Sequence, residues 1–138
     1  MDNEEYERVK GEIAAARTET GRRRYHEVMV SDAPPPMTPY LARGVVDSVF
    51  GELWDRPGLS RRDRRLVTLA CVGAAGVDTP IEQHVYAALA SGDLTREEFQ
   101  EVVLHFAYYA GWPRASALEA AYYRAVARLD AEVDVAER

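Results

Sequence analysis

Two parts of this sequence carry side chains whose types and spacing could do chemistry. The first is the turn FGELWDRPGL at residues 50–59, which brings a carboxylate, an indole and a guanidinium together as Glu52, Trp54 and Arg56. Glu52 falls near the end of an expected helix, where the negative end of the helix dipole disfavours a carboxylate unless a cation is close. Arg56 follows four residues later and is a candidate for that cation. The second part is His84, on a later helix.

His84 lies at the edge of an apolar stripe. It follows Ile81 by three residues and precedes Ala88 by four, so these side chains share one side of a helix. A titratable base at the wall of a pocket would stand in such a place. The alternative is a core histidine whose ring nitrogens are satisfied by neighbouring groups.

Aromatic residues gather in the turn YYAGWP at residues 108–113. Trp112, like Trp54, could supply a flat apolar wall for a bound molecule, and Tyr109 would make such a wall bulkier. The alternative for either tryptophan is a place in the hydrophobic core.

The remaining histidines and the cysteine give little support for metal or redox chemistry. His105 follows Glu101 by four residues, which predicts a carboxylate-paired histidine, and the three histidines lack HxxxH or HExxH spacing. Cys71 is the single cysteine, so it can form neither an intramolecular disulfide nor a CxxC pair. We expect Cys71 to be a core residue, and we expect no metal.

Composition limits the possible partners. The chain has 138 residues, 47% of them hydrophobic, which fits one globular domain. Seventeen basic and 23 acidic residues give a net charge of −6, the wrong sign for broad binding of nucleic acid. The RRDRR cluster at residues 61–65 could still hold a small anion, although such arginines are often solvated or salt-bridged. Without an apolar run of membrane-spanning length or a leader pattern, a cytoplasmic protein is expected.

The elements that would position these residues are all expected to be helices, because no segment alternates with a period of two. Ser60, Thr79 and Thr95 are expected caps, and Gly21 and Gly76 are expected stops. The helix at 61–75 is apolar almost all round, which predicts a central buried helix. A proline-rich linker is expected at 31–39. The expected helices span residues 3–20, 40–53, 61–75, 80–91, 96–110 and 114–130.

Three segments together resemble the carboxymuconolactone decarboxylase family. They read FGELWDRPGLSRRDRRLVTLACVGAAG, TPIEQHVYAALASG and LTREEFQEVVLHFAYYAGWP, and the likeness covers about residues 45–128. The ordered set of segments is specific to the family. We therefore expect a variable N-terminal helix and arm at 1–44, a family-like helical domain at 45–130 and a tail at 131–138.

The resemblance implies an all-α bundle of about six helices that assembles into trimers or hexamers, with cofactor-free sites near subunit contacts. One branch of the family is an alkylhydroperoxidase with a CxxCxxxH motif. Alignment on His84 puts Val77 and Pro80 at the two cysteine positions, which excludes peroxidase chemistry by that route. The other branch keeps the histidine and decarboxylates.

In that branch, the resemblance implies a cofactor-free lyase that acts on an unsaturated lactone or a related carboxylic acid. Loss of carbon dioxide leaves a dienolate, which needs charge stabilisation and a proton donor. His84 is then the expected acid or base, Arg64 and Arg56 are expected to bind carboxylate or oxyanion, and Glu52 is expected to hold the network. Trp54, Trp112 and Tyr109 are expected to contact substrate. Two alternatives stay open, a tailoring enzyme for an aromatic or polyketide-like acid and a non-catalytic ligand-binding oligomer.

Overall fold

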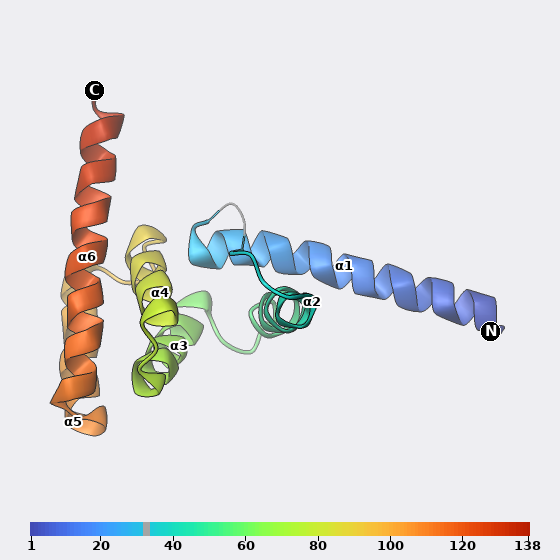
Figure 1. Ribbon diagram of the computed structural model, residues 1–138, viewed down its shortest axis with the longest axis horizontal. Coiled ribbons are helices and arrows are strands. Elements are labelled where there is room, and N and C mark those ends of the chain that lie inside the picture. Colours follow the sequence, from blue (N-terminus) through green and yellow to red (C-terminus); the bar gives the residue numbers. More distant parts are fainter. Residues whose placement is uncertain (32–33) are drawn as a thin grey trace. The chain divides into compact units, whose positions relative to one another are not determined.

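The protein is all-helical, as the sequence predicts. The computed structural model describes residues 1–31 and 34–138, and this part of the chain forms six α-helices and one π-helical segment without a strand (Figure 1). Part of the expected proline-rich linker, residues 32–33, lies outside the described residues. The elements are α1 (Asn3–Met29), α2 (Pro39–Ala42), η1 (Arg43–Leu53), α3 (Arg61–Ala75), α4 (Asp78–Ala90), α5 (Arg96–Ala110) and α6 (Trp112–Ala136).

The chain divides into two compact units. The first is Met1–Leu59 and the second is Ser60–Arg138. The boundaries expected after residues 44 and 130 stay a prediction, although α6 continues past residue 130 to Ala136. Among the described helices, none combines the length and the apolar character needed to cross a membrane.

In the first unit, α1 packs against η1 at a close helix crossing. The sequence predicted that this helix stops at Gly21. That prediction is wrong, because α1 runs on to Met29. Gly21 is instead a contact point, since a Cβ there would lie 1.9 Å from the carbonyl oxygen of Val46. Gly51 plays the same part on η1, where a Cβ would lie 2.6 Å from the carbonyl oxygen of Arg17.

An aromatic cluster closes this crossing. The ring of Phe50 meets the edge of Tyr25 at 4.8 Å and stacks on Trp54 at 6.2 Å. The backbone N–H of Trp54 donates to the carbonyl of Val49, five residues earlier, which is the π-helical pattern. The expected helix at 40–53 is thus present but wider than an α-helix.

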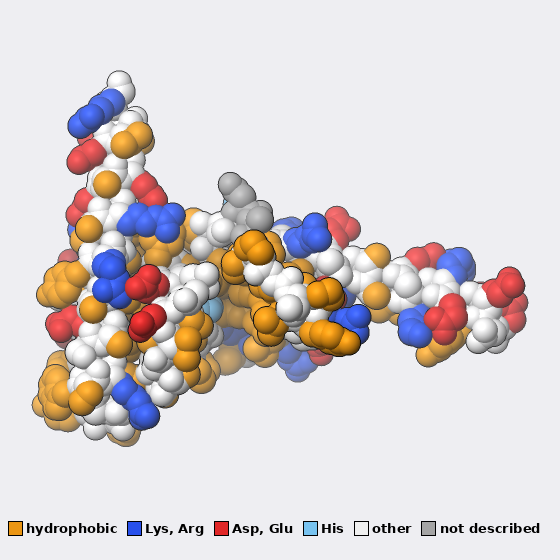
Figure 2. Space-filling model, viewed as in Figure 1, with side chains coloured by type: hydrophobic (Ala, Val, Ile, Leu, Met, Phe, Trp, Pro, Cys, Tyr) orange, Lys and Arg blue, Asp and Glu red, His pale blue; other side chains and the backbone are white. Residues whose placement is uncertain are grey.

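The N-terminal part of α1 carries charged side chains of both signs along its surface (Figure 2). Some form pairs along the helix, such as Arg8 with Glu12 at 2.7 Å and Lys10 with Glu7 at 3.1 Å. Exposed pairs of this kind each contribute only tenths of a kcal/mol. The α1 contacts that matter for the first unit are therefore those near Gly21.

In the second unit, the caps follow the sequence in two places out of three. The Ser60 hydroxyl accepts from the backbone N–H of Asp63 at 3.0 Å, and Thr95 forms a reciprocal capping box with Glu98. Gly76 ends α3 in the left-handed conformation, with φ of 69°. The expected Thr79 cap is wrong, because α4 begins at Asp78, after Val77, without a side-chain cap.

The core of the second unit lies between α4, α5 and α6. Leu69, Val85, Phe99 and Leu118 are completely buried there, and Phe99 stacks on Tyr122 at 5.4 Å. Only one side of α3 faces this core, the side that carries Leu69 and Gly73.

The prediction that α3 is a central helix buried all round is therefore wrong, and so is the prediction that Cys71 lies in the core. Cys71 is exposed, and Val67 is 56% exposed. The reason is that α3 packs through Leu69 and Gly73, with rings and methyl groups of Phe106 and Leu118 closing on Gly73. Its other apolar residues are partly buried or exposed, and they include Leu66, Val67, Ala70 and Val72.

The crossing of α1 over η1 gives a first prediction. Gly21→Ala should lower the free energy of unfolding by roughly 3 kcal/mol, the upper end for overpacking, because the new methyl group meets backbone that cannot rotate away. Gly11→Ala is the matched control, since nothing lies within 4 Å of a Cβ there. That change should stabilise the helix by up to about 1 kcal/mol. Urea unfolding followed by circular dichroism measures both, and equal effects would contradict the close crossing.

Candidate functional site

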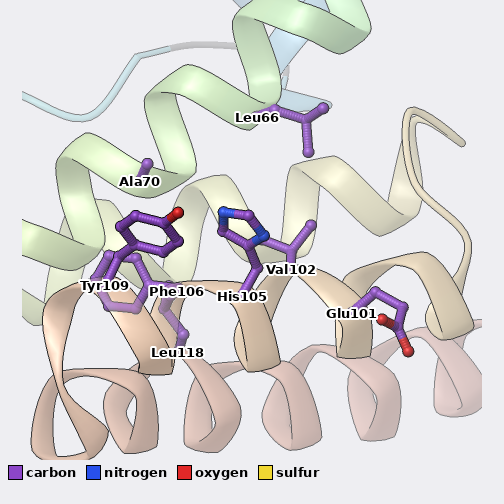
Figure 3. Close-up of a pocket in the computed structure, with 8 residues that line it drawn as sticks. All are labelled: Leu66, Ala70, Glu101, Val102, His105, Phe106, Tyr109 and Leu118. Atoms are coloured by element: carbon purple, nitrogen blue, oxygen red, sulfur yellow. The ribbon is translucent and has the colours of Figure 1, made fainter.

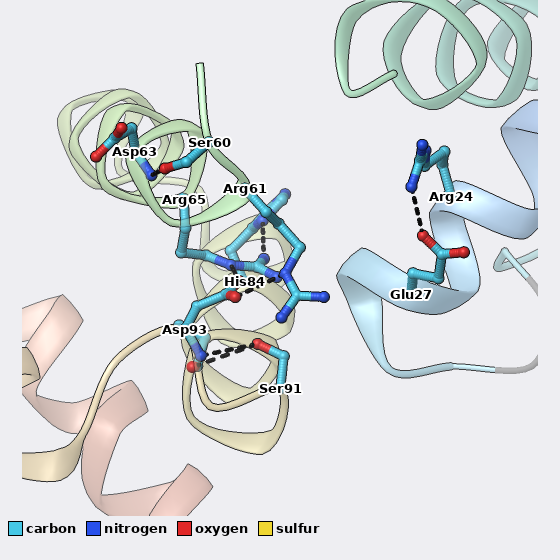
Figure 4. A network of polar contacts seen from close by, with 10 residues as sticks. Arg24, Glu27, Ser60, Arg61, Asp63, Arg65, His84, Ser91 and Asp93 are labelled. Carbon is cyan, nitrogen blue, oxygen red and sulfur yellow. Dashed lines mark hydrogen bonds and ion pairs between the residues drawn. The ribbon is translucent and has the colours of Figure 1, made fainter. Parts of the chain in front are cut away.

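A partly buried polar network joins α3, α4 and the loop between α4 and α5 (Figure 4). Its centre is Arg65, whose side chain is 0% exposed. The Nε–H of Arg65 donates to Oδ2 of Asp93 at 3.1 Å. One helical turn earlier, the Nε–H of Arg61 donates to Oδ1 of the same carboxylate at 2.7 Å. Asp93 therefore bridges two guanidinium groups.

His84 completes the network from α4. Nη1 of Arg65 lies 3.2 Å from Nδ1 of His84. A guanidinium nitrogen can only donate, so Nδ1 has to accept. This bond assigns His84 as the neutral tautomer that carries its proton on Nε2.

Electrostatics agree with that assignment. Burial, and secondly the positive charge of Arg65, lower the pKa of His84 from 6.5 to about 4. Burial also lowers the pKa of Arg65, while the hydrogen bond to Asp93 raises it. A guanidinium stays charged in proteins. Two guanidinium groups beside one carboxylate leave one excess positive charge next to a neutral imidazole, an arrangement that stabilises a small anion.

The predicted site residues of the second unit lie in different surroundings. His84 belongs to the network, whereas Arg64 is partly buried on α3, one residue and about 100° round the helix from Arg65. Tyr109 and Trp112 are 85% and 63% exposed. Trp112 contacts Tyr108, with ring centroids 5.8 Å apart.

The other predicted site residues belong to the first unit. Glu52 is exposed, and the cation paired with it is Arg17, at 3.7 Å, in place of the expected Arg56. Trp54 is buried in the aromatic cluster of that unit, and Arg56 is exposed. The roles given to these three residues stay predictions.

Sequence reasoning placed Arg65 in the RRDRR cluster without a role of its own, and it missed Asp93. For Arg65 a signal existed, because it precedes Leu69 by four residues and Gly73 by eight, which puts it on the core side of α3. For Asp93 there was none, since a single carboxylate in a Ser-Gly-Asp loop is common. Its importance comes from contacts across 28 residues or more.

An apolar groove lies between α3 and α5, with a volume of about 530 Å³ (Figure 3). His105 stands in it and stacks on Tyr109, with ring centroids 5.0 Å apart. The spacing predicted that His105 pairs with the Glu101 carboxylate, but the structure stacks its ring on Tyr109 instead. The lining residues are Leu66, Ala70, Glu101, Val102, His105, Phe106, Tyr109 and Leu118. Such a groove suits a flat apolar group.

The model of the carboxymuconolactone decarboxylase family matches residues 39–123, more than half of the chain. The chain belongs to the carboxymuconolactone decarboxylase family. The matched range includes α3 and α4 with the whole His84 network.

Two curated relatives of this chain are named as decarboxylases. The 4-carboxymuconolactone decarboxylase of Acinetobacter baylyi is 41% identical over 68 residues, which are 49% of this chain and 50% of the relative. The nitrosuccinic acid decarboxylase of Metarhizium robertsii is 33% identical over 87 residues, 61% of this chain and 60% of the relative. The chain thus spans about half or somewhat more of the length of these relatives.

The start of α4 carries Val77 and Pro80, the two positions compared above with the cysteines of the peroxidase branch. Val77 is the N-cap of α4 and Pro80 lies in its first turn, one turn before His84. The resemblance described above aligns these two positions with the cysteines of a CxxCxxxH motif, and this chain carries Val77 and Pro80 there. Within the described residues, no group of three or more His, Cys, Asp or Glu side chains could hold a metal ion.

The low pKa of His84 gives a second prediction. Well above pH 6.5 the imidazole is neutral in both folded and unfolded chains, so its titration does not change stability there. Below pH 6.5 the unfolded chain takes up the proton while the folded chain does not, and stability falls until about pH 4. Between pH 7 and pH 5 this loss should be roughly 2 kcal/mol.

Urea unfolding of the wild type and of His84→Gln at both pH values isolates this contribution. The variant lacks the titrating group, so its stability should fall less than that of the wild type over the same pH range. An equal fall in the two proteins would mean that His84 titrates normally.

Proposed function

We propose that the protein is a cofactor-free carboxy-lyase that acts on an unsaturated lactone or a related carboxylic acid, with His84 at its reacting centre. The observation that carries this proposal is the bond from Arg65 to Nδ1 of His84, which directs the one proton of a neutral imidazole to Nε2. Support also comes from the two relatives, both named decarboxylases. A cytoplasmic location is part of the same proposal and rests on the single cysteine.

The chemistry needs a positive field and one proton. The bond between the ring carbon and the carboxylate breaks, carbon dioxide leaves, and the electron pair spreads over the lactone as a dienolate. The excess positive charge of the Arg61, Arg65 and Asp93 group stabilises the negative charge that develops. A proton then forms the new C–H bond at the receiving carbon.

His84 is suited to supply that proton from Nε2. A neutral imidazole is a weak acid, but a neighbouring cation favours the ring after it has lost the proton, so Arg65 makes the N–H more acidic. The same N–H can donate a hydrogen bond to the dienolate oxygen before the transfer. The ring regains a proton from water after product formation.

The other predicted residues keep the roles that we proposed from sequence. Arg64 and Arg56 would bind a substrate carboxylate or oxyanion, and Glu52 would hold or polarise the charged groups around the substrate. Tyr109 and Trp112 are exposed enough to contact a substrate. Trp54 would contact substrate with the small part of its ring that its place in the aromatic cluster leaves exposed.

The direct test uses γ-carboxymuconolactone, followed by ultraviolet absorbance and release of carbon dioxide. His84→Gln should lower kcat by roughly 10²- to 10⁴-fold, the usual loss for a general acid. His26→Gln is the matched control, since it changes an exposed histidine of α1 that lies outside both the network and the α3–α5 groove, and its rate should stay near that of the wild type. A His84→Gln enzyme as fast as the wild type would defeat the proposed role.

One observation favours a second candidate substrate class. The α3–α5 groove is apolar and presents the stacked pair His105 and Tyr109, which suits the flat ring of an aromatic or polyketide-like acid. Absence of turnover with the lactone, together with turnover of an aromatic acid, would favour this tailoring role. Ligand binding without turnover of any acid, and unchanged by His84→Gln, would favour a non-catalytic binding protein.

We also propose that the protein is a homo-oligomer, a trimer or hexamer. Large apolar side chains of the second unit are exposed, and a helical surface of this kind is commonly covered by another subunit. They include Val67, Leu104, Tyr108 and Trp112. Size-exclusion chromatography with light scattering should give three or six times the 15.5 kDa of one chain. A monomer of that mass at micromolar concentration would contradict the assembly.

A further inference from the structure

Asp93 is held more rigidly than a loop carboxylate usually is. Its side chain is 3% exposed, and its backbone N–H donates to the hydroxyl of Ser91 at 3.3 Å. Gly92 turns the chain with φ of 74°, and the next residue, Leu94, donates to the carbonyl of Ala88 at 3.1 Å. The loop therefore delivers the carboxylate to one fixed place.

That place lies between two like charges. Arg61 and Arg65 are four residues apart on α3, so their side chains are neighbours and repel each other. Asp93 gives one oxygen to each of them, Oδ1 to Arg61 and Oδ2 to Arg65. Both guanidinium groups are oriented by the same carboxylate.

The orientation of Arg65 decides the tautomer of His84. A guanidinium is planar, so fixing Nε toward Asp93 also fixes the direction of Nη1, which points at Nδ1 of His84. A carboxylate placed directly against Nδ1 would require a proton there and would leave Nε2 as a base. With a guanidinium in between, the ring has the opposite polarity and Nε2 becomes a donor.

We propose that Asp93 is a positioning residue, which acts through Arg65 to hold His84 in the tautomer with its proton on Nε2. The catalytic consequence of this inference rests on the proposed function, whereas the tautomer itself does not. Asp93 bonds to Arg65 and Arg65 bonds to His84, so the effect of Asp93 on the tautomer passes through the Arg65 guanidinium.

The test is imidazole nitrogen NMR of the full chain, labelled with ¹⁵N in histidine. Three histidines give three ring signals, and the signal lost in His84→Gln identifies His84. Wild-type His84 should show its proton on Nε2 at pH 7. Asp93→Asn should convert it to a mixture of both tautomers, and Asp93→Glu should restore the Nε2–H form at least in part.

Arg61→Gln is the matched control. It removes one of the two bonds to Asp93 but leaves the path from Asp93 through Arg65 to His84, so the Nε2–H form should persist. In the lactone assay, Asp93→Asn should lower kcat by roughly 10- to 100-fold with little change in KM, as is usual when an orienting partner is lost. A folded Asp93→Asn protein with His84 still wholly in the Nε2–H form would overturn the proposal.

Circular dichroism shows whether Asp93→Asn folds. If it does not, the wild type decides the matter: a proton on Nδ1 of His84, or exchange of the Arg65 Nε–H as fast as that of exposed arginines, overturns the proposal. A Nε2–H tautomer with a slowly exchanging Arg65 Nε–H supports it. Because the NMR readout needs no substrate, a protein with the expected tautomer and no turnover would refute the proposed function and leave the role of Asp93 standing.

Discussion

The site depends on one buried cation. Arg65 has no exposed surface, so its charge has to be balanced within the protein, and Asp93 provides that balance. Removing one partner of a buried ion pair typically costs about 3–5 kcal/mol, because the other charge is left buried without compensation. The cation then imposes its own requirement on His84, which must accept at Nδ1 and remain neutral. Charge balance, tautomer and proposed acid chemistry follow from this single placement.

The second unit supplies the scaffold for that cation. Capping by Ser60 fixes the start of α3, so that Arg61 and Arg65 fall on successive turns of one side. Leu69 and Gly73 continue the same side into the core. The site is thus an extension of the hydrophobic packing of α3, with a guanidinium taking the place that an apolar residue has one turn later.

The sequence predicted what local physics controls. The cap at Ser60 and the all-helical class could be read from neighbouring residues alone. Gly21 could not, because its role comes from a crossing helix that sequence spacing does not show. Cys71 was misplaced since a helix of small apolar residues does not indicate which side is covered. His84 was found by periodicity, but its partner Asp93 lies in a loop and is recognised only by its long-range contacts.

A crystal structure with a bound unreactive carboxylic acid analogue of the lactone tests the central claim most directly. If the Nε2–H of His84 donates to the substrate, an oxygen of the analogue should lie roughly 2.7–3.1 Å from Nε2, the distance at which a donor stabilises a developing oxyanion. The network of Arg61, Arg65 and Asp93 should be unchanged in that complex. An analogue seated in the α3–α5 groove, with Nε2 of His84 not in contact with it, would contradict the account.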